Sequence, residues 1–339
     1  MIEVLPATLI DQSSVDLSVS PDTARRIRDA VPASTRRAYA HDRAQYDAWC
    51  SATGRVAVPA TAQTFAEYVS HLAGLDRAPK SIERALGAIR TQHRASGFEP
   101  PDRTAALLVL REHRKARARV GIQQRKATPL LLDGLRSLVE TCDPATPAGI
   151  RNRALIVLGF AMMARRSELV GLDIDDLGDV DDGMNVLIQW SKTDQDAVGH
   201  VLTVLSGSFP QSCPVRLVRA WRELLASRGQ ESGPLFRPID RHGRIFGEPK
   251  AAGASRTGRM SGYSVSIILR SAARQAGVST EALSAHSLRS GAATEAYRAG
   301  AGALSIARHG RWKDGSPVPL GYIRTVDKWR ENPMTGIGL

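Results

Sequence analysis

The chain is organised around three motifs within residues 285–325, which read A-H-S-L-R-S-G, A-R-H-G-R-W-K-D and L-G-Y-I-R-T. His286 and Arg289 are three residues apart, a spacing that places both on one face of a helix. Trp312 and Tyr322 follow. An arginine grips phosphate oxygens with a planar fork, a histidine moves a proton near neutral pH, and a phenol can attack phosphorus. The segment suits chemistry at a phosphodiester, although each residue alone is ordinary.

Further side chains complete this pattern toward the N-terminus, with R-R-S-E-L at 165–169 and W-S-K-T-D at 190–194. In order, spacing and chain position the set resembles the tyrosine recombinase (lambda-integrase) family. That family carries an R-x-x-E arginine, a hairpin lysine, an H-x-x-R, a His or Trp, and a tyrosine near the C-terminus. The likeness extends from about residue 34 to residue 322. The catalytic residues that it implies are Arg165, Glu168, Lys192, His286, Arg289, Trp312 and Tyr322.

The resemblance implies a site-specific recombinase that cleaves and rejoins DNA through a 3′-phosphotyrosyl intermediate. The ester conserves the energy of the broken bond, so neither a metal nor another cofactor is expected. Two alternatives differ in kind: a type IB topoisomerase-like enzyme that relaxes DNA by the same chemistry, and a catalytically inactive DNA-binding protein of the same fold. The implied roles are nucleophile for Tyr322, phosphorane stabilisation for Arg165 and Arg289, proton transfer for His286 and Lys192, and phosphate support for Trp312.

Three of these assignments compete with ordinary alternatives. Arg165 follows an apolar helix and could be a cation at the helix C-terminus. A lysine at a hairpin tip is usually only solvated, so Lys192 is chosen because the family has one there. His309 competes with Trp312 for the fifth site. Nine residues separate Trp312 from Tyr322, about one more than in the family pattern that the chain follows best.

Composition indicates a polyanionic partner. Among the 339 residues, 46 Lys and Arg outnumber 34 Asp and Glu, for a net charge of +12 and a pI near 10.2. This excess favours nucleic acid. Cys50, Cys142 and Cys213 are scattered, which indicates neither disulfides nor a zinc site. No apolar run is long enough to span a bilayer. We therefore expect a cytoplasmic protein, bacterial or encoded by a phage or plasmid, with no membrane partner.

The N-terminal third is expected to be helical. A flexible arm at 1–20 precedes a helical core-binding domain at 21–121 and a linker at 122–129. Within the domain, apolar residues recur at helical spacing from Ser34 to Gly54, after Thr61, from Pro79 to Gly97, and from Asp102 to Val120, where Leu107, Val109 and Leu110 should be buried. The basic residues expected to contact DNA, rather than to form a merely solvated face, are Lys80, Arg84, Arg90, Arg94, Arg111, Arg114 and Lys115.

The catalytic domain is expected at 130–339, including a C-terminal tail. It should contain helices at 130–141, 150–163, 214–227, 261–276, 286–299 and 303–309, and two strands at 185–190 and 200–205 with Lys192 between them. The predicted fold is mainly α with one small antiparallel β-sheet. The resemblance implies double-stranded DNA with inverted-repeat sites as partner and a homotetramer on that DNA. It also implies that the tail after Tyr322 packs into a neighbouring protomer; a frayed terminus is the alternative.

Overall fold

The chain divides into two compact units, Met1–Gln124 and Arg125–Leu339, here called the first and the second unit. The computed structural model describes residues 18–122, 127–189, 199–252, 255, 257–313, 315–319 and 321–322. Four predicted features fall wholly or partly outside the described residues: most of the arm, half of the linker, Lys192 and the tail. Each unit has its own buried core.

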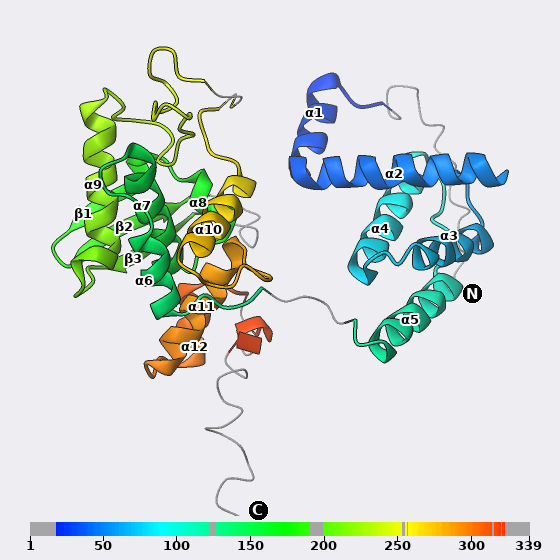
Figure 1. Cartoon of the computed structure of the whole chain (residues 1–339). Coiled ribbons are helices and arrows are strands. Elements are labelled where there is room, and N and C mark those ends of the chain that lie inside the picture. The colour runs from blue at the N-terminus through cyan, green and yellow to red at the C-terminus, as the bar shows by residue number, and fades with distance from the viewer. Residues whose placement is uncertain are drawn as a thin grey trace, which may run out of the picture. The chain divides into compact units, whose positions relative to one another are not determined.

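The first unit consists of helices in its described part (Figure 1). Their bounds are Pro21–Ala30 (α1), Ala33–Thr53 (α2), Ala62–Gly74 (α3), Pro79–Ala95 (α4) and Thr104–Arg119 (α5). The four expected helices are confirmed, and α1, which buries no residue, is an addition. The ends follow local rules: Gly54 closes α2 in the left-handed conformation at φ 66°, and the Thr61 hydroxyl caps α3 by accepting from the Thr64 N–H.

Aromatic residues fill the core of the first unit. Tyr46 of α2 packs edge-on against Tyr68 of α3, with ring centroids 4.9 Å apart, and both are almost fully buried. On α5 the buried positions are Ala106 and Leu110, four residues apart. The expectation that Leu107 is buried is therefore wrong: it is 38% exposed, because it lies about 100° around the helix from Ala106.

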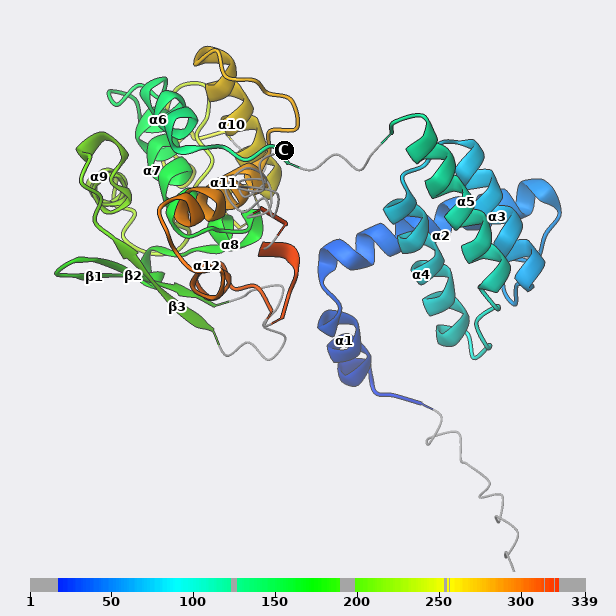
Figure 2. The same ribbon diagram turned by 90° about the horizontal axis from the view of Figure 1, so that it is seen from below.

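The second unit combines helices with one three-stranded sheet (Figure 2). Its helices are Leu132–Glu140 (α6), Pro147–Ala161 (α7), Arg166–Gly171 (α8), Pro214–Ser227 (α9), Gly262–Gln275 (α10), Ala285–Arg298 (α11) and Ala303–His309 (α12), with short 3-10 turns at Ile174–Asp176 (η1) and Pro210–Ser212 (η2). The strands are Leu177–Val180 (β1), Gly183–Ile188 (β2) and His200–Leu205 (β3). The mainly helical fold with a small antiparallel sheet is confirmed, but the sheet has a third strand, β1, that was not expected.

Helix α7 lies at the centre of the second unit and positions the site. It contacts α6, α8, α9 and α11. Residues 154–159 of α7 are all buried, so the helix is apolar around its whole circumference. A Cβ on Gly159 would come within 2.9 Å of the Leu169 and Leu288 side chains. This close approach brings the end of α7 against α8 and α11, the two helices that carry the R-x-x-E and H-x-x-R motifs.

No helix in the described part of the chain is long and apolar enough to cross a lipid bilayer.

Candidate active site

Helix α11 contributes the H-x-x-R motif. Its N-cap, Ser284, accepts a hydrogen bond from the His286 N–H at 3.2 Å, which begins the helix just before the histidine. Arg289, one turn further, is 1% exposed. Its guanidinium donates to the backbone carbonyls of Met163 and Gly310. Its central carbon also lies 3.8 Å from the centroid of the Trp312 ring, so the cation stacks on the indole.

Helix α8 contributes the R-x-x-E motif. Arg165 is its N-cap, and the Glu168 carboxylate accepts from the Arg165 backbone N–H at 2.8 Å and from its guanidinium at 2.5 Å. Glu168 is fully buried as a side chain, whereas Arg165 keeps 18% of its side chain exposed. Arg165 is therefore not a cation at the end of α7, which stops four residues earlier at Ala161. It stands at the start of a new helix and is held by its own carboxylate.

Tyr322 approaches these groups from the far end of the chain. Its hydroxyl lies 2.5 Å from Nε2 of His286. Its ring centroid is 6.0 Å from that of Trp312. Both aromatic rings pack on a small apolar cluster that includes Ala293 and Ile306. The described structure thus brings together Arg165, Glu168, His286, Arg289, Trp312 and Tyr322, while Lys192, the remaining predicted site residue, is outside it.

Trp312 and His309 occupy different surroundings. Nε2 of His309 lies 2.8 Å from the carbonyl oxygen of Ala161, which engages that ring nitrogen with the backbone of α7. Trp312 instead contacts both Arg289 and Tyr322. The geometry favours Trp312 as the fifth member of the site.

Arg311 also belongs to this cluster, although sequence reasoning passed over it. It is 8% exposed and forms an ion pair of 2.7 Å with the buried Glu168. Locally, H-G-R-W resembles an ordinary charged turn. A basic residue directly beside Trp312 was the only signal in the sequence, and it is a weak one.

The pKa values of His286 and Tyr322 are shifted in opposite directions. The surrounding protein lowers the pKa of His286 through burial, and the nearby Arg289 and Arg165 guanidiniums lower it further. Burial raises the pKa of the Tyr322 phenol, which Arg289 partly offsets. Burial likewise lowers the pKa of Arg289 to about 9, so this guanidinium stays charged at neutral pH. At neutral pH the site therefore presents a neutral imidazole to a protonated phenol.

The seven basic residues predicted to contact DNA all lie on α4 and α5 of the first unit. Three of them are engaged with carboxylates. Arg84 binds Asp42 through two hydrogen bonds of 2.7 and 2.9 Å, and the Asp42 side chain is only 5% exposed. Lys80 and Arg114 both pair with Glu83.

The other four predicted contacts are not engaged by carboxylates in this way. Arg94, Arg111 and Lys115 are exposed, and Arg90 is half-buried. In the described part of the chain, none of the four has a carboxylate within ion-pair distance. Helical spacing places Lys80, Arg84, Arg90 and Arg94 within about 120° of the circumference of α4.

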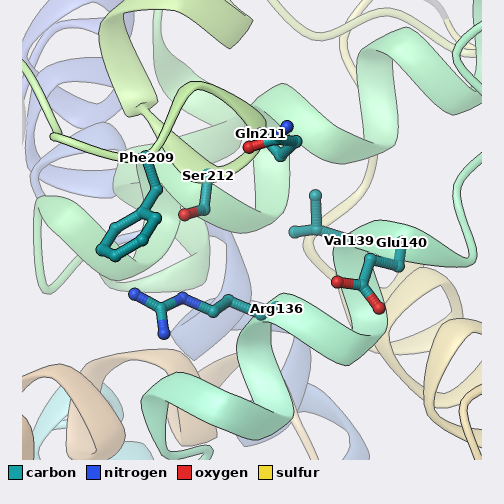
Figure 3. A pocket seen from close by; sticks show the side chains of 6 residues that line it. All are labelled: Arg136, Val139, Glu140, Phe209, Gln211 and Ser212. Carbon is teal, nitrogen blue, oxygen red and sulfur yellow. The ribbon is translucent and has the colours of Figure 1, made fainter.

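A pocket of about 230 Å³ elsewhere in the second unit holds none of the predicted site residues. Figure 3 shows Arg136 of α6 pointing toward the ring of Phe209, whose centroid is 4.4 Å from the guanidinium carbon. Among the described residues, no group of three or more His, Cys, Asp or Glu side chains is arranged to hold a metal ion.

Comparisons with known proteins agree with this fold. Residues 130–328 match the model of the phage integrase family. The chain is 31% identical over 311 residues to an integrase/recombinase XerD homolog of Selenomonas ruminantium, covering 91% of this chain and 87% of that relative. It is 27% identical over 330 residues to the recombinase Cre of Escherichia phage P1, covering 95% of this chain and 93% of Cre.

Solved structures show the same fold. A lambda integrase dimer bound to a core site aligns with a TM-score of 0.53 and 12% identity, over 89% of this chain and 93% of that one. A transposon integrase in complex with transposon right end DNA aligns with a TM-score of 0.56 and 12% identity, over 89% and 92%.

Fold and relatives together define a tyrosine recombinase, an enzyme class that cleaves and rejoins DNA. The chain belongs to the phage integrase family, and the order of its site residues is close to the pattern of Cre.

Proposed function

We propose that this site-specific recombinase cuts one DNA strand by attack of Tyr322 and keeps the 3′ end as a phosphotyrosyl ester. The observation that carries the proposal is the 2.5 Å contact between the Tyr322 hydroxyl and Nε2 of a histidine whose pKa is lowered by burial and by neighbouring arginines. A phenol with a pKa near 10 is almost wholly protonated at neutral pH, so it needs a base beside it.

The cleavage step balances with groups of this chain. His286 takes the phenolic proton at Nε2 as the Tyr322 oxygen bonds to phosphorus. The bond from phosphorus to the 5′ oxygen breaks, and the leaving oxygen takes a proton from Lys192. In rejoining, a 5′ hydroxyl of a partner duplex attacks the phosphotyrosine and gives its proton to the neutral amine of Lys192. The tyrosine oxygen takes its proton back from His286 as it leaves. No external energy source is needed, because an ester replaces an ester.

Arg165 and Arg289 stabilise the charge that develops on the phosphorane. Both guanidiniums are held by groups other than solvent: Arg289 by two backbone carbonyls, and Arg165 by Glu168 and the Arg311 carbonyl at 3.1 Å. Donors that are fixed before the reaction need no reorganisation in the transition state. The Trp312 indole supports Arg289 with its ring face and can donate its N–H to a phosphate oxygen.

The first unit holds DNA through basic residues of α4 and α5. Arg94, Arg111 and Lys115 are exposed without a carboxylate partner among the described residues, so they are free to bind phosphates. Arg84 acts differently: its two hydrogen bonds to buried Asp42 stabilise the fold of the first unit, so contact with DNA is not its main role.

Membership of the family supports a proposal for the partners and the location of the protein. We propose that the protein binds double-stranded DNA with inverted-repeat sites as a homotetramer, with the tail after Tyr322 contacting a neighbouring protomer. We place it in the cytoplasm of a bacterium, acting on chromosomal, phage or plasmid DNA. The organisms of its relatives, a bacterium and a bacterial phage, support this.

Covalent capture tests the proposal and does not require the target sequence to be known. The tagged protein is incubated with fragmented DNA of the organism that encodes it and denatured, and the attached DNA is sequenced. We expect adducts at few loci, each flanked by an inverted repeat. Adducts at many unrelated positions together with relaxation of a supercoiled plasmid would indicate the topoisomerase-like alternative. Binding without any adduct would indicate the inactive DNA-binding alternative.

A further inference from the structure

Arg311, beside Trp312, contacts the R-x-x-E motif of α8, more than 140 residues away in the sequence. Its guanidinium pairs with Glu168 of α8 at 2.7 Å and donates to the carbonyls of Met162, at 3.2 Å, and His309, at 2.9 Å. Its own carbonyl accepts from the Arg165 guanidinium at 3.1 Å. The residue is therefore linked to Arg165 twice, once through Glu168 and once through its backbone.

The backbone of Arg311 adopts a conformation that is unusual for a residue with a side chain. Arg311 has a φ of 56°, in the left-handed region that favours glycine. A non-glycine residue pays about 1 kcal/mol for this conformation. Glycine would be the easier residue at this position, so the contact that the arginine side chain makes bears on its role. It forms an ion pair with the fully buried Glu168 side chain.

Charge balance indicates what the side chain does. The carboxylate of Glu168 is shared, with Oε1 toward Arg165 and Oε2 toward Arg311. Without Arg311, Arg165 would be the only guanidinium on a buried carboxylate. A buried carboxylate that loses one of its two cationic partners is less well compensated, so Glu168 and the Arg165 guanidinium that it holds are less firmly placed.

We propose that Arg311 is a positioning residue for DNA cleavage, which holds Glu168 and thereby sets the place of the Arg165 guanidinium. The proposal rests on the proposed function of Tyr322 as nucleophile. It adds an arginine that touches neither DNA nor the reacting atoms but acts through two other residues of the site.

The decisive variant is Arg311→Gly, which removes the guanidinium and relieves the backbone at the same time. Arg311→Lys keeps the charge but not the planar fork. Arg298→Ala is the matched control, because Arg298 forms an exposed 3.0 Å ion pair with Glu295 in the same unit. Each protein is assayed for thermal unfolding, DNA affinity and single-turnover cleavage on a nicked duplex that carries a site found by covalent capture.

We expect Arg311→Gly to unfold cooperatively and to bind the duplex within about twofold of the wild type. Its cleavage rate should fall by about 10- to 100-fold, since misplacing a catalytic group by about 1 Å costs on the order of 100-fold. Arg311→Lys should lie between the two proteins. Arg298→Ala should cleave as the wild type does.

The pH profile separates positioning from a general structural loss. Burial raises the pKa of Glu168, but Arg311 and Arg165 together bring it below its usual range. Without Arg311 the pKa of Glu168 rises, so the carboxyl is protonated at a higher pH and releases Arg165. The cleavage rate of Arg311→Gly should therefore begin to fall at a higher pH than that of the wild type. A purely structural defect lowers the rate equally at every pH.

A double substitution completes the test. If Arg311 acts through Glu168, then Arg311→Gly should cost much less in a Glu168→Gln background than in the wild type. Full cleavage by Arg311→Gly, or a loss that is the same at every pH and in both backgrounds, would overturn the proposal. A wild-type protein that forms no adduct at all would overturn the proposed function instead, so the two failures can be distinguished.

Discussion

Nε2 of His286 lies 2.5 Å from the hydroxyl oxygen of Tyr322, across 36 residues of chain. This contact joins the L-G-Y-I-R segment to the H-x-x-R motif, and it pairs a proton acceptor with a weakly acidic phenol. Arg289, on the same helix as His286, faces the Trp312 ring that also packs near Tyr322. One helix, α11, therefore carries both the proposed base and a proposed phosphate-binding cation of the site.

The ionisation of His286 should appear in the pH dependence of cleavage. Only the neutral imidazole can accept the phenolic proton, so the rate should fall as the pH drops through the pKa of His286. Because burial and two arginines lower that pKa, the midpoint of the fall should lie below a pH of about 6.5. The measurement uses DNA far below saturation, where the profile reports ionisation of the free enzyme.

Two variants test whether His286 is the group that causes the fall in rate at acidic pH. His286→Gln should lose the acidic fall and cleave about 100- to 10,000-fold more slowly. His242→Gln, at an exposed turn of the same unit, should keep the wild-type profile. An unchanged acidic fall in His286→Gln would assign the titration to another group.

Arg289→Lys should impair cleavage far more than binding. A lysine keeps the charge but cannot donate to the Met163 and Gly310 carbonyls together while it stacks on Trp312. Loss of one preorganised donor typically costs about 100- to 1,000-fold in rate. Single-turnover cleavage and DNA affinity are measured side by side, with Arg298→Lys as control. Equal losses of rate and affinity would mean that Arg289 binds DNA without a special role in the transition state.

Two arginines of α4 should behave differently, although both were predicted to contact DNA. Arg84→Ala leaves buried Asp42 without its cation, so the first unit should lose about 1–3 kcal/mol of unfolding free energy. Arg94→Ala should leave the unfolding temperature unchanged and lower the magnitude of the log-log salt slope of DNA binding by about 0.9. Thermal unfolding and salt titration of both variants check this. The reverse pattern would make Arg84 the phosphate contact and Arg94 the structural one.

The proposed role of Lys192 is tested by changing the leaving atom of the DNA substrate. If its ammonium protonates the 5′ oxygen, Lys192→Ala should cleave an ordinary phosphodiester slowly but recover on a 5′-bridging phosphorothiolate, because a thiolate leaves without a proton. DNA affinity should hardly change. The same defect on both substrates would assign Lys192 to DNA positioning, and His286 would become the first candidate for the general acid.

Local sequence rules predicted most elements of the fold because most elements obey them. The helix after Thr61, the helix expected at 286–299 and the strand expected at 200–205 were all readable from short patterns. Strand β1 was missed because L-G-D-V is short and contains a glycine and an aspartate, both of which disfavour strands. Helix α8 has only six residues, too few for a periodic pattern to be recognised.

The sequence predicts which side chains belong to the site, but not the contacts that hold them. Motif order points to the arginines, the histidine and the tyrosine, and the structure brings these side chains together. The pairing of Arg311 with Glu168 spans 143 residues, and that of Arg84 with Asp42 spans 42, so no local pattern contains either one. The left-handed backbone of Arg311 is equally invisible, since arginine does not signal a positive φ.

Covalent trapping by Tyr322→Phe tests the central claim most directly. On a nicked suicide duplex that carries the captured site, the wild type should yield a protein–DNA adduct that survives denaturing electrophoresis, and so should Tyr263→Phe, which alters a tyrosine that is 64% exposed. Tyr322→Phe should bind the duplex with unchanged affinity and yield no adduct, because it lacks only the nucleophilic oxygen. An adduct that persists in Tyr322→Phe would contradict the account and place the nucleophile on another residue.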